Sequence, residues 1–178
     1  LAQELRNLAK VIADMQNAPL ASGKMPEIFG FCEVEHQALL EQLFEKYLKA
    51  KNYQFVYHET KDFRGIDIGF AYDSTRVKMR TLKTHPVEIH GRFSRDILEI
   101  EFEFKGKRLI VFGNHWPSRA GGKQRSEPKR GRAAAILRRA VDKHLAKNPF
   151  AEIVLLGDFN DEPRDLSIKG KKGLNAHG

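Results

Sequence analysis

Apolar residues recur at spacings of three and four in three stretches of the chain, and this period predicts three amphipathic helices. The expected helices cover residues 1–16, 36–51 and 127–147. Ser126 is a candidate N-cap for the third helix, and Asn148-Pro149 should end it. Each helix has one apolar face, so each is expected to pack against another layer of the protein.

Strands are predicted where short apolar runs or strict alternation lie between turn residues. The expected strands cover residues 27–34, 53–58, 66–72, 76–80, 87–93, 98–104, 109–112 and 153–156. The fourth and fifth are expected at sheet edges, whereas the last is apolar throughout and expected to be buried. In the sixth, glutamates alternate with apolar residues, which predicts one buried and one solvent-facing side. Gly106 supplies the turn of a hairpin that joins this strand to the next one.

Hairpins combined with separate helices predict sheets covered by helices, in one domain that spans residues 1–178. Hydrophobic residues make up 41% of the chain and charged residues 30%, the balance of an ordinary globular protein. This composition excludes disorder for most of the chain. The tail from Ser167 is rich in Gly and Lys, and we expect it to lack regular structure.

The chain carries a formal net charge of +8, which suits a polyanionic partner. Nucleic acid, phospholipid headgroups and a phosphorylated small molecule all meet that description, and a basic surface without a partner is the alternative. The single cysteine, Cys32, excludes an intrachain disulfide and is expected to be a buried structural thiol. We find no signal peptide and no apolar run long enough to span a membrane, so the compartment stays open.

Polar residues gather at the ends of three apolar strands, where an α/β sheet exposes functional side chains. Glu33 can ligate a hard cation, or it favours the N-terminus of the next helix. His115 can donate to a phosphoryl oxygen or shuttle a proton, or it is a loop histidine packed under Trp116. Asp158 and Asn160 project to the same side of an extended backbone and suit water and phosphate contact, unless they form an ordinary turn.

Four segments in this order resemble the endonuclease/exonuclease/phosphatase family, and the resemblance covers nearly the whole chain. The segments are Glu33-Val34-Glu35, Phe63-Arg64-Gly65-Ile66-Asp67, Asn114-His115-Trp116-Pro117-Ser118-Arg119 and Gly157-Asp158-Phe159-Asn160-Asp161-Glu162-Pro163. The family includes pancreatic-type deoxyribonucleases, abasic-site endonucleases, neutral sphingomyelinases and inositol-polyphosphate phosphatases. The resemblance implies an α/β (α+β) fold, a β-sandwich of two mixed sheets flanked by helices in the four-layer DNase I-like arrangement.

The resemblance also implies a metal-dependent hydrolase that cleaves a phosphate ester by in-line attack of water. Glu33 matches the family's ligand for Mg²⁺ or Mn²⁺. His115 matches the catalytic histidine, and Glu59 matches an acidic residue that orients it. Asp158 and Asn160 match the residues that hold the attacking water and the phosphate.

Substrate contact is expected from two further places. Arg64 and Asp67 lie in a turn that often faces substrate in the family. Arg119 and Arg125 belong to a basic cluster beside the proposed site, which can grip a phosphate backbone or merely line a solvated loop. The cluster consists of Arg119, Lys123, Arg125, Lys129, Arg130 and Arg132.

The sequence departs from the family's pattern at both ends. The family begins with a strand that supplies an Asn near the metal, whereas this chain opens with the helix expected after it. The family ends with an Asp-His pair, and no Ser-Asp-His pattern occurs here. His177 lies in the tail and is not assigned that role. We therefore expect the chain to hold the middle of the fold, incomplete at both termini.

A nuclease that hydrolyses nucleic-acid phosphodiester bonds is the leading interpretation, with the phosphate backbone as partner. A phosphatase or phospholipid phosphodiesterase of the same fold is one alternative, which apolar membrane-facing loops would favour. A non-catalytic nucleic-acid-binding domain is the other alternative, and the absent terminal elements favour it. The set of Glu33, His115, Asp158 and Asn160 speaks against that last interpretation, because binding alone does not need it.

Overall fold

A computed structural model describes residues 1–17, 23–62, 64–170 and 173–174, so Phe63 and His177 lie outside the described residues. The helices are α1 (Ala2–Met15), α2 (Gln37–Glu41) with its π-helical continuation (Gln42–Tyr47), α3 (Lys123–Lys147) and α4 (Leu166–Lys169). The strands are β1 (Ile28–Val34), β2 (Tyr53–Tyr57), β3 (Asp67–Asp73), β4 (Val77–His85), β5 (Glu88–Ile89), β6 (Arg92–Phe93), β7 (Ile97–Phe104), β8 (Lys107–His115) and β9 (Glu152–Asp158).

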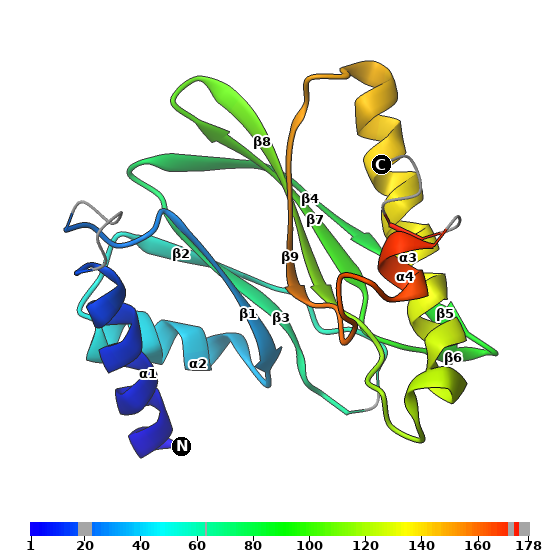
Figure 1. Ribbon diagram of the computed structural model, residues 1–178. Helices are drawn as coiled ribbons and strands as arrows, with labels where there is room; N and C mark the ends of the chain where they lie inside the picture. Colours follow the sequence, from blue (N-terminus) through cyan, green and yellow to red (C-terminus); the bar gives the residue numbers. More distant parts are fainter. Residues whose placement is uncertain (18–22, 63, 171–172, 175–178) are drawn as a thin grey trace.

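Two sheets form the centre of the molecule. The first has the order β1-β3-β2 and is antiparallel throughout. The second has the order β4-β7-β8-β9 and is mixed, because β8 and β9 run parallel and are connected through α3. Figure 1 shows α1 and α2 on one side of the sheets and α3 with α4 on the other. This arrangement is the expected α/β architecture of packed sheets with flanking helices.

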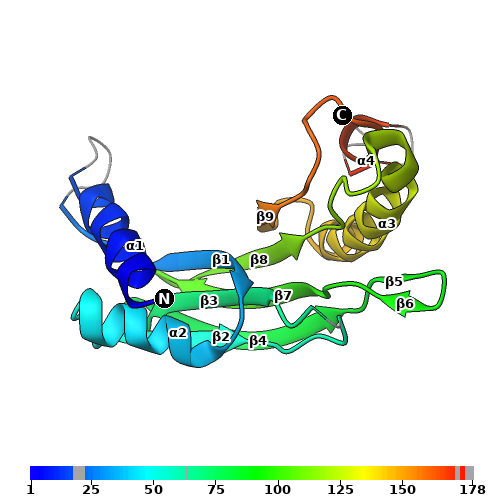
Figure 2. The same cartoon turned by 90° about the horizontal axis from the view of Figure 1, so that it is seen from below.

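Three separate apolar clusters lie at the three interfaces between these layers. The first joins α1 and the π-helical segment to the first sheet, and it contains Leu5, Ile12, Phe29, Leu43, Phe44 and Ala71. The second lies between the sheets and contains Val56, Phe70, Leu98, Ile100, Phe102 and Val111. The third lies under α3 and contains Ile110, Phe112, Trp116, Ala133, Leu137 and Val141. Figure 2, turned by 90°, shows α3 lying beyond β8 and β9 while α1 lies beside β1.

Alternation in β7 does bury one face in the core between the sheets, but the other face is not simply wet. Glu99 is only 3% exposed, because α3 covers this end of the second sheet. Its carboxylate pairs with Lys83 (3.0 Å), His85 (2.8 Å) and His144 (3.0 Å). The expectation of a solvent-facing glutamate row is therefore wrong at Glu99, where Lys83 and His85 from β4 and His144 from α3 stabilise a buried carboxylate.

The strand predictions need two further corrections. Residues 87–93 do not form one edge strand; they fold back as the small hairpin of β5 and β6. β9 is an edge strand rather than a buried one, with Val154 at 42% exposure. β4 lies at the opposite edge, as expected, and extends to His85. An apolar run alone does not distinguish a central strand from an edge that another layer covers in part.

The third predicted helix ends at Lys147 as expected, but its start and the tail of the chain differ from expectation. α3 begins at Lys123 after Gly122, so Ser126 lies inside the helix and its hydroxyl donates to the Gly122 carbonyl (2.7 Å). The tail is structured in its described part, where α4 contains the buried Ser167 and Leu174 joins the core under α3. The Gly- and Lys-rich composition therefore hid a short element that packs on α3.

Candidate functional site

The carboxyl ends of the parallel strands β8 and β9 bring the histidine and aspartate motifs side by side. His115 and Asp158 are direct partners in the strand register, and the Trp116 N–H donates to the Asp158 carbonyl (2.8 Å). Glu33 approaches from the end of β1, with its Oε1 atom 3.8 Å from His115 Nε2. The structure thus assembles on one edge three polar groups that are far apart in sequence.

A bulge in β1 positions Glu33. The pairing of β1 with β3 shifts between Phe31 and Val34, and Glu33 adopts a left-handed backbone with φ of 62°. This bulge turns the Glu33 side chain outward, where it is 68% exposed. The neighbouring Cys32 is half-buried, as a structural thiol, and its Sγ donates to the Asn114 carbonyl at 3.5 Å.

His115 is almost fully buried, at 3% exposure, and its Nδ1 atom has no hydrogen-bond partner within the described residues. The buried Arg95 donates from Nε to the His115 carbonyl (3.2 Å) and from Nη2 to the Trp116 carbonyl (3.3 Å). Burial lowers the pKa of His115 below its usual value, and the positive charge of Arg95 lowers this pKa further. Both effects favour the neutral form of the imidazole.

A tight turn after β9 sets the positions of Asp158 and Asn160. The Asn160 N–H donates to Asp158 Oδ1 (2.8 Å), and Asn160 Nδ2 donates to the Trp116 carbonyl (2.9 Å). Asn160 has a φ of 52°, within the left-handed region that asparagine tolerates. Gly157 has a φ of 125°, and a Cβ there would lie 1.9 Å from the Asn114 carbonyl oxygen. Glycine is thus required for the close approach of the two strand ends.

The sequence patterns did not single out Asn114 and Arg95, which hold this edge together. Asn114 is fully buried; its Nδ2 donates to the carbonyls of Phe112 (3.1 Å) and Leu156 (3.3 Å), and its Oδ1 accepts from Trp116 Nε1 (3.1 Å). An asparagine directly after an apolar run was the available signal for the first. Arg95 lies in a short irregular stretch whose burial has no local signature.

Glu59, Arg64 and Asp67 were also predicted near the site, and the structure places them differently. Glu59 is exposed and makes no hydrogen bond with His115 in the described part of the chain. Arg64 Nε donates to Asp62 Oδ1 (2.8 Å), and both residues line a pocket of about 560 Å³ beside the hairpin of β5 and β6. Arg64 therefore has access to a ligand near the edge.

Asp67 is fully buried, which corrects the expectation that it faces substrate. Its carboxylate accepts hydrogen bonds from the Thr60 hydroxyl (2.5 Å) and the Tyr57 hydroxyl (3.3 Å). Burial, together with the nearby Asp67 charge, raises the pKa of Tyr57 to about 12. Asp67 thus fixes the loop that follows β2 instead of contacting solvent.

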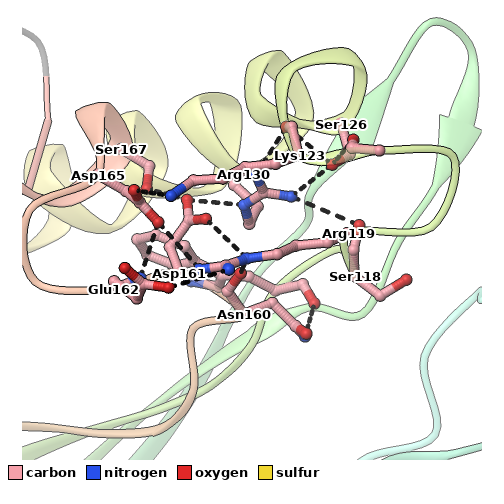
Figure 3. Close-up of polar contacts among 12 residues, drawn as sticks. Ser118, Arg119, Lys123, Ser126, Arg130, Asn160, Asp161, Glu162, Asp165 and Ser167 are labelled. Atoms are coloured by element: carbon pink, nitrogen blue, oxygen red, sulfur yellow. Dashed lines mark hydrogen bonds and ion pairs between the residues drawn. The ribbon is translucent and has the colours of Figure 1, made fainter.

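Three of the six residues of the basic cluster form ion pairs with carboxylates of the chain itself (Figure 3). Arg130 Nε lies 2.6 Å from Asp161 Oδ2, and both side chains are fully buried. Arg119 Nη2 and Lys123 Nζ reach the two oxygens of Asp165 at 3.0 and 2.5 Å. Hydrogen bonds from Lys123 and the Glu162 N–H lower the pKa of Asp165 to about 2.

The prediction that all six residues of the basic cluster are available to bind phosphate is therefore wrong for these three. Arg119 also donates from Nε to the Asn160 carbonyl (2.9 Å), so it braces the turn that carries Asp158 and Asn160. Its side chain keeps 35% exposure. Arg125, Lys129 and Arg132 are exposed, and within the described residues none of them forms an ion pair.

The donor chemistry of the edge suits a hard cation that keeps most of its water. Glu33 and Asp158 offer two exposed carboxylates, and Mg²⁺ is commonly bound by one or two carboxylates together with substrate phosphates. The described residues contain no group of three or more His, Cys, Asp or Glu side chains placed to hold a metal ion, so a closed structural zinc site is not formed by them. No helix in that part of the chain is long and apolar enough to cross a bilayer.

Comparison with known proteins gives one family and a set of solved structures. The sequence model of the Endonuclease/Exonuclease/phosphatase family matches residues 1–178. A truncated TDP2 from Caenorhabditis elegans is 16% identical, with a TM-score of 0.68 over 92% of this chain and 57% of that one. TDP2 from D. rerio, complexed with a single-strand DNA product, is 19% identical, with a TM-score of 0.65 over 99% of this chain and 60% of that one.

The catalytic domain of human Nocturnin with a bound sulfate anion is also similar, at 19% identity and a TM-score of 0.65 over 91% of this chain and 59% of that one. At these identities the likeness establishes the fold. The chain spans 57% to 60% of the length of the three structures. No curated protein matches the sequence.

Proposed function

Since the chain belongs to the endonuclease/exonuclease/phosphatase family, we propose that it forms part of a metal-dependent phosphodiesterase that cleaves nucleic acid. One observation carries the proposal. An exposed carboxylate, Glu33, lies 3.8 Å from the ring nitrogen of the buried His115, and a second exposed carboxylate, Asp158, is its neighbour in the strand register. Structural polar groups in a sheet are normally hydrogen-bonded, whereas here both carboxylates are exposed and the Nδ1 atom of the buried His115 has no partner within the described residues.

Asp158 is the group that orients or deprotonates the attacking water. Its Oδ1 accepts the Asn160 N–H, which fixes the carboxylate at the turn. No hydrogen bond from the described residues occupies Oδ2, so this oxygen is free to accept from water. Its position at the carboxyl end of β9 makes in-line approach to a phosphate bound beside β8 geometrically accessible.

His115 and Asn160 stabilise the phosphoryl group as its charge develops. A neutral imidazole donates one N–H, and protonation becomes more favourable when an anion lies beside it. One N–H of the Asn160 amide is used by the Trp116 carbonyl, which leaves the second N–H for a non-bridging oxygen. Arg95 holds the backbone on which His115 is carried and thereby positions the ring.

Glu33 and Asp158 are the residues that would hold the divalent cation, Mg²⁺ or Mn²⁺. When bound, such a cation neutralises charge on the phosphoryl and leaving-group oxygens. The β1 bulge directs the Glu33 side chain toward this edge.

Nucleic acid is the preferred substrate because exposed cations line a pocket next to this edge. Lys129 and Arg92 are exposed and line the pocket beside the β5–β6 hairpin, and neither forms an ion pair within the described residues. Arg64 lines the same pocket but pairs with Asp62. Cations that have no acid of their own are suited to phosphates of a polynucleotide. The complex of D. rerio TDP2 with a single-strand DNA product is consistent with this choice.

The test is nicking of supercoiled plasmid and cleavage of labelled single-stranded DNA and RNA by the purified protein. We expect cleavage with Mg²⁺, no cleavage with EDTA, and a rate reduced by about a hundredfold or more in His115→Gln. His36→Gln is the matched control, because His36 is exposed and its side chain does not cap α2. Cleavage that persists in EDTA or in His115→Gln would refute the mechanism. Hydrolysis of a phospholipid or small phosphate ester without nucleic-acid cleavage would support phosphoester hydrolysis at this site but refute nucleic acid as the substrate.

A further inference from the structure

A second pocket, of about 270 Å³, lies between the end of β4 and the middle of α3. From α3 it is lined by Arg132, Ile136, Arg139 and Lys143, and from the β4 side by His85 and Pro86. The four α3 residues follow spacings of four, three and four, so they form one stripe on one face of the helix. None of the motifs that define the catalytic edge contributes to it.

Three basic side chains line this pocket, Arg132, Arg139 and Lys143. Within the described part of the chain, Arg132, Arg139 and Lys143 form no ion pair, although Arg138 on the same helix pairs with Asp142. All three are exposed. Three unpaired cations around one concave site lower the free energy of an anion there, and they repel each other while the site is empty.

A buried carboxylate behind the pocket wall, Glu99, is neutralised by its own partners and does not oppose an anion in the pocket. Glu99 is buried beneath His85 and accepts from Lys83 Nζ (3.0 Å), His85 Nε2 (2.8 Å) and His144 Nε2 (3.0 Å). Burial alone would raise the pKa of Glu99, but these three hydrogen bonds outweigh burial and lower it. The carboxylate is thus saturated, and it fixes the ring of His85 in the pocket wall.

The pocket beside the β5–β6 hairpin is lined by neighbouring parts of the same two segments of the chain, and it includes Pro117 and Ser118, which follow His115. Lys129 lines the pocket beside the β5–β6 hairpin, and Arg132 on the next turn of α3 lines the second pocket. On the facing side, Ile89 lines the first pocket and Pro86 the second. At 1.5 Å per residue, Lys129 and Lys143 are about 21 Å apart along α3. Figure 1 shows the hairpin beside the first half of α3.

We propose that the pocket between β4 and α3 is an anion-binding exosite for a backbone phosphate of a nucleic-acid strand whose scissile bond lies at His115 and Asp158. The proposal rests on the proposed function and extends it to a polymeric substrate, because a small phosphate ester cannot reach both places at once. An acidic membrane is the less suitable partner. None of the exposed large apolar side chains of the described residues lines this pocket, and membrane-surface binding needs apolar insertion beside the cations.

The test compares the double variant Arg139→Gln/Lys143→Gln with wild type. Its control, Lys10→Gln/Lys51→Gln, removes the same charge from exposed lysines of α1 and the turn before β2, in the layer remote from α3. Binding of a single-stranded DNA of about 20 nucleotides is measured with Ca²⁺ or EDTA between about 50 and 200 mM salt. We expect the pocket variant to bind about tenfold more weakly and its salt dependence, log Kd against log salt, to lose about 1.4 units of slope for two phosphate contacts. The control should match wild type.

Hydrolysis of bis(p-nitrophenyl) phosphate with Mg²⁺ should be unchanged in the pocket variant, because this substrate occupies only the catalytic edge. Equal affinity and equal salt slope in wild type and pocket variant would overturn the exosite. So would loss of binding to phosphatidylserine vesicles with unchanged DNA binding, which would assign the pocket to a membrane. If wild type binds DNA through the pocket but cleaves no nucleic acid, the proposed function fails, and the pocket is a phosphate-binding site without the link to a scissile bond.

Discussion

Asp158, at the end of β9, and Asp161 lie three residues apart, yet one carboxylate is exposed and the other is buried in an ion pair. Asp158 is exposed and accepts one backbone hydrogen bond, from Asn160. The Asp161 side chain is fully buried 2.6 Å from Arg130 Nε, and it also accepts a hydrogen bond from the Ser167 hydroxyl. A carboxylate neutralised by the chain's own cation stabilises the fold, whereas one left open keeps its charge for an external group.

The arginines divide in the same way. Arg130 forms an ion pair with Asp161, and Arg119 forms one with Asp165. Arg132, two residues after Arg130 in α3, is exposed and forms no ion pair with the described residues. Residue type and proximity in sequence therefore do not separate structural from functional charges. The presence of a built-in partner does, and each of the following changes tests that distinction.

The largest effect is expected where the structural pair is broken. Arg130→Met removes the nearer of the two cations that neutralise the buried Asp161, the other being Arg119 at 3.6 Å. We expect the free energy of unfolding to fall by about 3 kcal/mol, the lower end of the range for a broken buried pair. Urea denaturation followed by circular dichroism measures the change. Adding Asp161→Leu should restore most of the loss, because the pair is then replaced by apolar groups. A loss below about 1 kcal/mol in Arg130→Met would mean that water or another group neutralises Asp161.

The open carboxylate should show the reverse pattern. Asp158→Asn keeps an acceptor for the Asn160 N–H but loses the negative charge, so we expect cleavage to slow by about 10² to 10⁴-fold. Its free energy of unfolding should change by no more than about 0.5 kcal/mol, as for other exposed positions. Initial rates and urea denaturation on the same preparation check both statements. A strongly destabilised Asp158→Asn protein would place this residue with Asp161.

The smallest effect concerns protons at His115. Its pKa is lowered by burial and by Arg95, so the unfolded chain takes up a proton at a higher pH than the folded protein does. Protonation therefore favours unfolding, and this penalty grows as pH falls below about 6.5 toward the folded pKa. We expect His115→Gln to lose less stability than wild type between pH 7 and pH 5.

An NMR titration of the His115 ring checks the cause directly. We expect a midpoint below about 6.5, and a higher one in Arg95→Gln, because the nearby positive charge is gone. A midpoint that does not move in this variant would leave burial as the sole origin. The pKa values of Asp62 and Asp165 are lowered in the folded protein, so both carboxylates contribute to its stability while they are ionised. The folded protein loses this contribution only at more acidic pH, as the two groups become protonated.

Sequence periodicity predicted the helices, most strands and the three motifs at strand ends, because each of these signals is local. The parallel pair β8 and β9, joined by α3, then brings His115 and Asp158 together without further information. Ion pairs between residues far apart in the sequence could not be predicted from these local patterns. Arg130 meets Asp161 across 31 positions, and nothing local marks that contact. For the same reason Glu99 read as solvent-facing, although two of its partners lie in β4 and one in α3.

The left-handed backbone at Glu33 has a consequence for evolution under different pressures. A residue with a Cβ pays about 1–2 kcal/mol for this conformation, a cost that glycine escapes. Random mutagenesis scored only by survival on heating should therefore enrich glycine at position 33, while screening for turnover should retain glutamate. The two selections would then favour different residues at position 33. That difference would show that the Glu33 carboxylate is retained for activity although glycine suits this backbone conformation better.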